Sequence, residues 1–229
     1  MKPVHAIAID GPVAAGKGTI ARLLSHKFNG FNLNTGAMYR CVALYCMQHN
    51  VPVQKPREVI AILPHVVIDL EDEKVFLNHE DVTEDVKKRD VSLLSSKVAA
   101  IRQVREAMVK RQQEIGLTKI DRGMIVIAEG RDAATKIFPD AALKIFLTAR
   151  PEIRAKRRFE QMGGGANHTI TFEQILQDTN ERDRRDYERT VDPLVKNPEQ
   201  YGYFVLDNSD MSEEETVNAV LGEWKKSAL

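Results

Sequence analysis

The feature of this sequence that most limits its possible folds is a glycine-bracketed segment close to the N-terminus. Gly11 and Gly16 enclose four residues, and Lys17 follows, in the pattern G-x-x-x-x-G-K. Residues 4–9 before it are mostly apolar and β-compatible, and residues 20–28 after it repeat apolar side chains at helical spacing. A strand, a glycine turn and a helix in this order let several backbone N–H groups converge on one oxyanion, and the helix N-terminus adds its positive dipole end. The segment predicts a phosphate-binding loop; the alternative is a glycine-rich turn with a surface lysine.

The hydroxyl that usually binds magnesium in such a loop is displaced by one position. Gly18 follows Lys17, and the hydroxyl comes with Thr19. The Gly-Lys-Gly-Thr order resembles that of nucleoside monophosphate kinases, in which this loop holds the donor nucleotide and magnesium keeps more of its waters. We therefore expect Mg²⁺ to arrive with ATP and assign it no direct protein ligand; the displaced hydroxyl of Thr19 is the alternative. The residues predicted to bind ATP are Gly11, Pro12, Val13, Ala14, Ala15, Gly16, Lys17, Gly18 and Thr19.

Segments with strand and helix periodicity alternate along the chain, which is typical of an α/β fold with a parallel sheet and helices on both faces. A hairpin pattern interrupts the alternation at residues 66–70 and 75–78, and helical periodicity resumes at about 91–113. We expect a single P-loop kinase domain over residues 1–229, with a small acceptor-side β insert and a helical lid. The insert is predicted at about 58–90, the lid at 150–168, and the main strands at 4–9, 31–33, 124–128, 143–147 and 203–207.

Charge and composition exclude several classes of function. The 229 residues carry 33 basic and 33 acidic side chains, so the formal net charge is zero, which argues against coating of nucleic acid or of an anionic membrane. The sequence has no apolar run of about 18 residues and no signal-type apolar core before Asp10. We expect a cytoplasmic monomer. Cys41 and Cys46 lie five positions apart in a predicted helix, which suits neither a disulfide nor a zinc site.

Several arginines are candidates for the second anion site that a kinase needs. Arg131 follows directly on a buried apolar strand, at the carboxyl edge where open α/β sheets bind ligands. Arg40 lies just past a Thr-Gly turn, and Arg182 and Arg189 belong to a charged helix. For any one of them the alternative is a solvated surface arginine.

A second group of arginines precedes a run of three glycines. Arg154, Arg157 and Arg158 have three- and four-residue spacing in a predicted helix, and the glycines follow at 163–165. This pattern favours a hinged cationic flap, and the alternative is a salt-bridged surface helix. A role in RNA contact is weaker, because acidic residues interrupt the basic ones from Glu152 onward.

Taken together, these motifs resemble bacterial cytidylate kinases. Their order and spacing cover almost the whole chain, including the β insert that distinguishes this family from the shorter adenylate kinases. Two positions depart from the family pattern: Asn34 replaces an aspartate, and Ala133 with Ala134 replaces a bulky residue and a glycine. The matching blocks are residues 11–19, 35–40, 96–100 with 104–105, 129–132, 138–141 and 181–189.

The resemblance implies transfer of the γ-phosphoryl group of ATP to CMP or dCMP. It implies that Arg40, Arg131 and Arg189 hold the acceptor phosphate with help from Thr35. Arg182 and Asp186 would then reach the sugar or the transferring group. The implied CMP-binding residues are Thr35, Tyr39, Arg40, Ser96, Arg105, Arg131, Asp132, Arg182, Asp186 and Arg189, and the implied catalytic residues are Lys17, Arg131, Arg154, Arg157, Arg158 and Arg182.

The expected base-reading residues also suit cytosine chemically. Cytosine offers an amino donor at N4 beside acceptors at N3 and O2, so the carboxylate of Asp132 matches N4, and Ser96 and Arg105 match the acceptors. Uracil reverses the upper two groups and would leave Asp132 facing an oxygen. The alternatives are a kinase of another small acceptor, such as UMP, AMP or shikimate, and a non-catalytic nucleotide-binding module.

Overall fold

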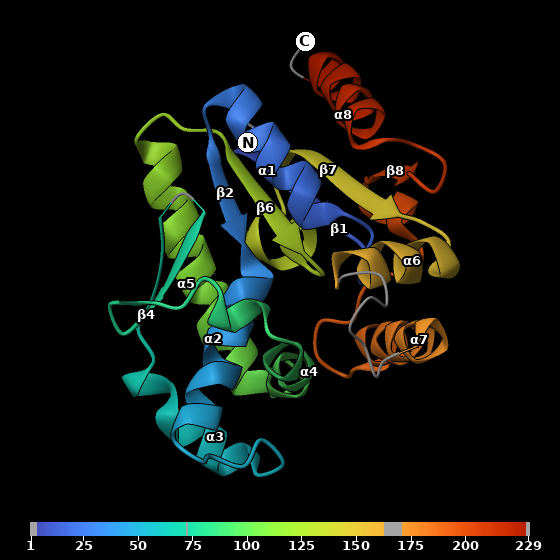
Figure 1. The fold of residues 1–229 in the computed structure, drawn as a ribbon. Helices are drawn as coiled ribbons and strands as arrows, with labels where there is room; N and C mark the ends of the chain where they lie inside the picture. The colour runs from blue at the N-terminus through green and yellow to red at the C-terminus, as the bar shows by residue number, and fades with distance from the viewer. Residues whose placement is uncertain (1–3, 72, 163–170, 228–229) are drawn as a thin grey trace.

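A five-stranded parallel sheet forms the centre of the molecule. The computed structural model describes residues 4–71, 73–162 and 171–227 (Figure 1). The strand order is β2-β6-β1-β7-β8, and every neighbouring pair is parallel. The parallel α/β sheet predicted from the alternating pattern is confirmed. The strands are β1 (Val4–Asp10), β2 (Phe31–Asn34), β6 (Val126–Gly130), β7 (Ala141–Thr148) and β8 (Phe204–Asp207).

Helices cover both faces of this sheet, as its short apolar strands require. Ala6 and Ala8 of β1 belong to one buried apolar cluster and Ile7 and Ile9 to the other, because successive side chains of a strand point to opposite faces. Figure 1 shows the helices on the two sides. The helices that contribute to the first cluster include α2 (Thr35–Gln48), α4 (Arg89–Val98) and α5 (Arg102–Asp121), and those of the second include α1 (Lys17–Phe28) and α8 (Glu213–Ser227).

A small antiparallel sheet lies beside α5, inside the segment predicted as a β insert. β3 (Ile68–Glu71) pairs with β4 (Lys74–Leu77), as the hairpin pattern predicts, and β4 also pairs with the two-residue strand β5 (Glu80–Asp81). Arg111 of α5 donates to the Asp69 carboxylate (2.7 Å) and so ties the small sheet to the main body. The short helices around it are α3 (Pro56–Ile62) and the 3₁₀ turns Leu63–His65 and Asp85–Lys87.

The helical segment predicted at about 91–113 is present, and it is divided into two helices. α4 ends at Val98 and α5 begins at Arg102, and Ile101 between them is extended, with ψ of 120°. The break frees the carbonyl oxygen of Ala99, which accepts from Arg105 Nη1 (3.2 Å). Periodicity alone does not reveal the break, because it is stabilised by this guanidinium contact and not by a glycine or proline.

Two further helices lie beyond the carboxyl ends of the strands. α6 (Pro151–Gln161) and α7 (Phe172–Glu188) lie side by side (Figure 1), and Phe159 and Phe172 meet edge to face with their ring centroids 6.3 Å apart. The predicted glycine joint at 163–165 and the rest of the lid, to residue 168, lie outside the described residues. A π-helical turn (Ala133–Ile137) and a 3₁₀ turn (Pro198–Tyr201) complete the structure.

Three smaller predictions can be compared with the structure. Ser212 and Glu215 form the expected capping box before α8, and Cys41 and Cys46 are buried free thiols in α2. A membrane-crossing helix needs about 20 mostly apolar residues, and none of the helices in the described ranges meets that requirement.

Candidate active site

A pocket of about 490 Å³ opens at the carboxyl ends of the central strands. Its walls include Asn34 at the end of β2, Gly130 at the end of β6 and Asn208 after β8, together with the loop after β1. Open parallel sheets bind ligands at this edge, and the volume falls in the range of small-molecule sites. The predicted site residues that line it are Val13, Ala14, Gly16, Lys17, Gly18, Thr19, Thr35, Tyr39, Arg40, Ser96, Arg105, Arg131, Asp132, Arg157, Arg158, Arg182, Asp186 and Arg189.

The loop between β1 and α1 has the backbone shape that its glycines permit. Gly11 has φ of 149°, and a Cβ there would lie 2.0 Å from the Leu147 carbonyl oxygen of β7, so only glycine fits against that strand. Gly16 has φ of 90° and precedes the first residue of α1. The loop therefore turns tightly into the helix, whose N-terminal amides point toward the pocket.

Lys17 is a buried cation beside this loop. Its side chain is 5% exposed, and its Nζ donates to the Pro12 carbonyl oxygen (2.6 Å). Burial, with repulsion from Arg131, lowers the pKa of Lys17 to about 7. A phosphate bound nearby would raise the pKa of Lys17 again and restore its charged form.

Residues on α6, on α7 and after β8 hold the loop in place through hydrogen bonds. The Asp183 carboxylate accepts from Val13 N–H (3.0 Å), and Arg154 Nη1 donates to the Val13 carbonyl oxygen (2.9 Å). Asn208 Nδ2 donates to the Ala15 carbonyl oxygen (3.2 Å). Asp183 stands in a sequence block with no assigned role, and Asn208 carries no local signal except that it follows a strand.

The three arginines predicted to form a cationic flap lie on α6, and they differ in where their side chains are placed. Arg157 and Arg158 line the pocket, whereas Arg154 does not. Arg154 is 4% exposed and also bonds to Asp183 and to the Ala149 carbonyl oxygen (2.8 Å). Its guanidinium is thus held behind the loop, which helical spacing could not distinguish from a position facing the ligand.

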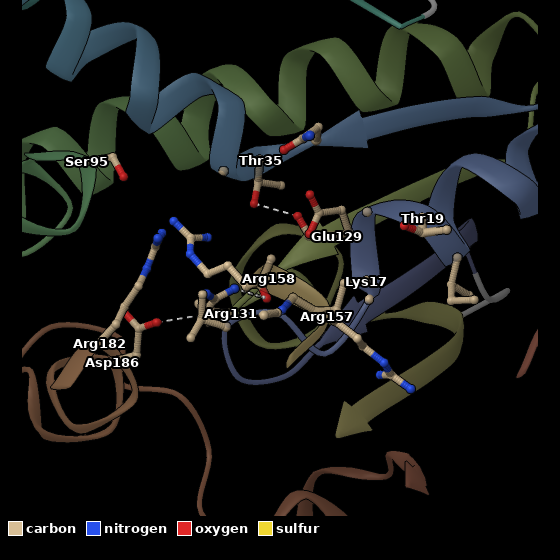
Figure 2. Close-up of a pocket in the computed structure, with 18 of the residues that line it drawn as sticks. Lys17, Thr19, Thr35, Ser95, Glu129, Arg131, Arg157, Arg158, Arg182 and Asp186 are labelled. Atoms are coloured by element: carbon tan, nitrogen blue, oxygen red, sulfur yellow. Dashed lines mark hydrogen bonds and ion pairs between the residues drawn. The ribbon is translucent and has the colours of Figure 1, made fainter. Parts of the chain in front are cut away.

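The opposite wall of the pocket concentrates positive charge. Arg131 pairs with Asp186 of α7 (2.7 Å), and Figure 2 shows this contact with Arg182 beside it. Burial, reinforced by Arg131, lowers the pKa of Arg182 to about 9, and burial also lowers the pKa of Arg40. The lining contains eight cationic side chains and four carboxylates: Lys17, Arg40, Arg105, Arg131, Arg157, Arg158, Arg182 and Arg189 against Glu129, Asp132, Asp186 and Glu213.

Unpaired donors in this wall point to anionic ligands. The Nε atoms of Arg40 and Arg182 are buried and find no hydrogen-bond partner among the described residues. Leaving a buried charged donor unpaired costs at least about 1–3 kcal/mol. Because the cationic side chains in this pocket outnumber the carboxylates, a polyanion such as a phosphate would stabilise them most.

At one end of the pocket a buried ion pair joins two of the expected base-reading residues. Arg105 Nη2 bonds to the Asp132 carboxylate, and Arg105 Nε bonds to Asp192 (3.0 Å). The Arg105 guanidinium also lies over the Tyr39 ring, 5.4 Å from its centroid. Ser96 lines the same end, but its oxygen accepts from Arg185 Nη1 (2.6 Å). Asp192 has no recognisable signal in the sequence.

The residues at the two departures from the family pattern take part in local hydrogen bonds. Asn34 caps α2, since its Oδ1 accepts from Ala37 N–H (2.9 Å). The N–H groups of Ala133 and Ala134 both donate to the buried Asp10 carboxylate (2.8 and 2.9 Å), which also accepts from the Tyr203 hydroxyl (2.7 Å). Asp10 therefore links the end of β1 to the loop that follows Asp132.

A parallel sheet of this order, with an amide-lined glycine loop after its central strand β1, defines the class of P-loop phosphate-binding proteins. The facing guanidinium wall is the arrangement of a phosphotransferase. The family model of cytidylate kinase matches residues 7–226, and the chain belongs to the cytidylate kinase family.

Named relatives match over nearly the whole length. The cytidylate kinase of Bacillus pumilus is 40% identical over 225 residues, 96% of each chain. The cytidylate kinase of Polynucleobacter asymbioticus is 38% identical over 100% of both chains. A crystal structure of an uncharacterized protein from Eubacterium ventriosum superposes with a TM-score of 0.52 at 12% identity, covering 96% of this chain and 98% of that one. This last likeness supports the fold alone.

Proposed function

We propose that this protein transfers the γ-phosphoryl group of ATP to CMP, and also to dCMP. The observation that carries the proposal is that one pocket contains both the N–H-lined loop with Lys17 and the guanidinium wall around Arg131. Two phosphate sites that share a pocket suit in-line transfer between two bound nucleotides, whereas a nucleotide-binding module needs only the first.

The donor nucleotide would bind along residues 11–19, with its terminal phosphates beside Lys17. The acceptor phosphate would be held by Arg40, Arg131 and Arg189. Thr35 supports this wall, because its hydroxyl donates to the Glu129 carbonyl oxygen (2.7 Å) and fixes the end of β6. Side chains from three separate segments, namely α2, the loop after β6 and the end of α7, would thereby converge on one anion, which favours positioning as a main source of catalysis.

The remaining acceptor contacts would recognise the sugar and the base. Arg182 and Asp186 face the pocket from α7 (Figure 2) and would reach the sugar or the transferring group. Asp132 and Arg105 would meet the cytosine edge as a preformed pair, with Ser96 and Tyr39 at the same end.

The residues present fit a magnesium ion that keeps much of its water. Glu129 is 9% exposed and lines the pocket, and its Oε1 lies 3.8 Å from the position that a Cβ on Gly18 would take. Thr19 lines the same pocket, and within the described ranges no cluster of three His, Cys, Asp or Glu side chains could hold a metal ion. Glu129 and Thr19 would hold Mg²⁺ together with water and phosphate oxygens. When bound, the ion neutralises charge on the β- and γ-phosphates.

The chemistry then needs no general base, because the acceptor oxygen is already anionic. Lys17 and Arg131 would stabilise the charge that spreads over the transferring group, and Arg158 of α6 would add to it. Lys17 is buried and Arg131 and Arg158 are partly buried, so their interactions with the phosphoryl group are stronger than in water. Enclosure by α6 and α7 would also exclude water, which otherwise competes as the acceptor.

The protein is further proposed to act as a monomer on small nucleotides. Among the described residues, the large exposed apolar side chains, Met47, Val67, Leu117 and Tyr201, lie on separate segments of the chain and form no continuous stripe. The proposed substrates favour the cytoplasm as its location, and the zero net charge argues against nucleic acid as a partner.

A panel of nucleoside monophosphates at one fixed ATP concentration tests the function. ADP release is measured with CMP, dCMP, UMP or AMP and without acceptor, and we expect the highest kcat/KM for CMP or dCMP. A faster reaction with UMP or AMP would identify a different acceptor. ADP release that is independent of every acceptor, or absent, would contradict the kinase assignment.

A further inference from the structure

Arg154 and Asp183 form a buried pair behind the phosphate loop and touch both polar atoms of one loop residue. Asp183 accepts from Val13 N–H (3.0 Å), and Arg154 donates to the Val13 carbonyl oxygen (2.9 Å). The two side chains also bond to each other. Arg154 is 4% exposed, Asp183 is 9% exposed, and neither lines the pocket. Neither residue can therefore contact a ligand there without rearrangement of the loop.

The contact to the Val13 carbonyl determines where the next amide points. A trans peptide unit is planar, so its C=O and its N–H lie in opposite directions. Because Arg154 holds the Val13 oxygen on the helix side, the N–H of Ala14 in the same peptide unit is directed away from Arg154. Ala14 lines the pocket and has φ of 57°, an unfavourable value for alanine that requires outside support.

A second peptide unit of the loop is held in the same way. Asn208 Nδ2 donates to the Ala15 carbonyl oxygen (3.2 Å), and Arg157 of α6 donates to the Asn208 side-chain oxygen (3.0 Å) and backbone oxygen (2.7 Å). By the same geometry, the N–H of Gly16 is directed away from Asn208. Helix α6 thus fixes alternate carbonyls of the loop through two independent arginines.

We propose that Arg154, held by Asp183, is a positioning residue that aims the Ala14 amide of the phosphate loop at the bound donor nucleotide. The inference rests on the proposed donor role of this loop, and it replaces the direct catalytic contact predicted for Arg154. Asp183 lies on α7 between the acceptor-side residues Arg182 and Asp186. The pair therefore also ties the donor loop to the helix that carries the acceptor contacts.

Equilibrium binding of ATP and of CMP to the full-length protein tests the inference. We expect Arg154→Met to raise the Kd for ATP about tenfold, the effect of one net hydrogen bond lost from the phosphate cradle. The Kd for CMP should change less than about twofold. The matched control is Arg150→Met, because Arg150 immediately precedes the same helix and its guanidinium pairs with the exposed Asp210, away from the phosphate loop. This control should leave both constants unchanged.

The double variant Arg154→Met/Asp183→Asn separates positioning from stability. Arg154→Met alone leaves a buried carboxylate unpaired, and the second change removes its charge, so the unfolding temperature should recover. The weakened ATP binding should persist, because the Val13 carbonyl still lacks its donor. If Arg154→Met is too unstable to purify, the double variant alone supplies the comparison of ATP with CMP.

Three results would overturn the proposal. They are unchanged ATP binding by the variants, equal weakening of ATP and CMP, and recovery of ATP affinity together with stability in the double variant. Failure of the proposed function is distinguishable, since CMP-dependent ADP release by the parent protein is measured separately. If the parent shows none while the ATP effects appear as expected, the acceptor assignment fails and the positioning role stands.

Discussion

Protonation of Lys17 should be coupled to ATP binding, and this coupling can be measured directly. Burial and the neighbouring Arg131 lower the pKa of Lys17 from 10.5 to about 7, which corresponds to about 5 kcal/mol against its charged form. Because its folded-state pKa is depressed, Lys17 reduces the free energy of unfolding fully below pH 7, and this loss is relieved as the pH rises from about 7 to 10.5. Phosphates bound beside Nζ would restore the charged form.

The expected number of protons taken up follows from these values. At pH 8 a group with a pKa of about 7 is about one-tenth protonated, so restoring its charge takes up about 0.9 proton. At pH 6 the same group is already mostly protonated and takes up about 0.1 proton. The affinity for ATP should accordingly fall by about tenfold per pH unit above pH 7, and should level off below it.

Isothermal titration calorimetry in buffers of different ionisation enthalpy provides the assay. The slope of the binding enthalpy against the buffer's ionisation enthalpy gives the number of protons exchanged. Lys17→Met has a similar apolar stem without the amine, so the difference between parent and variant isolates Lys17 from titration of ATP itself. Equal slopes for the two proteins at pH 8 would refute the reasoning, because they would show that Lys17 is already charged before ATP binds.

Two further predictions concern the acceptor end of the pocket. Asp132→Ala should reduce the ratio of kcat/KM for CMP over UMP by about 10- to 100-fold, which is the effect of losing a hydrogen bond to a charged group. Arg105 would stay paired in this variant, because it also bonds to Asp192. Steady-state assays with both acceptors measure the ratio, and an unchanged ratio would remove Asp132 from base recognition. Burial raises the pKa of Asp10 to about 6, so its contribution to stability is full below pH 3.8 and is lost as the pH rises to about 6. Between pH 4 and 6 the unfolding free energy of the parent should fall about 1.4 kcal/mol per pH unit more steeply than that of Asp10→Asn, and parallel urea-unfolding curves over this range would contradict the shifted pKa.

Much of the fold could be predicted because its signals are local. The glycine loop, the short apolar strands and the helices after them depend on periodicity and turn chemistry within about ten residues, and the structure contains each of these elements. The order of blocks along the chain also predicted which side chains would gather at one sheet edge, since parallel strands present their carboxyl ends together. Lys17, Arg131 and Asp132 do meet in one pocket.

Tertiary structure alone decided how these side chains are paired. Asp183 bonds to Val13, 170 positions away, and Tyr203 bonds to Asp10, 193 positions away. Such contacts leave no periodic trace, because either partner alone resembles an ordinary polar residue. The break between α4 and α5 depends on a guanidinium contact of the same kind. The sequence by itself thus determined the elements and the chemistry available at the site, whereas packing between distant segments determined whether an arginine such as Arg154 faces the ligand or supports the loop that binds it.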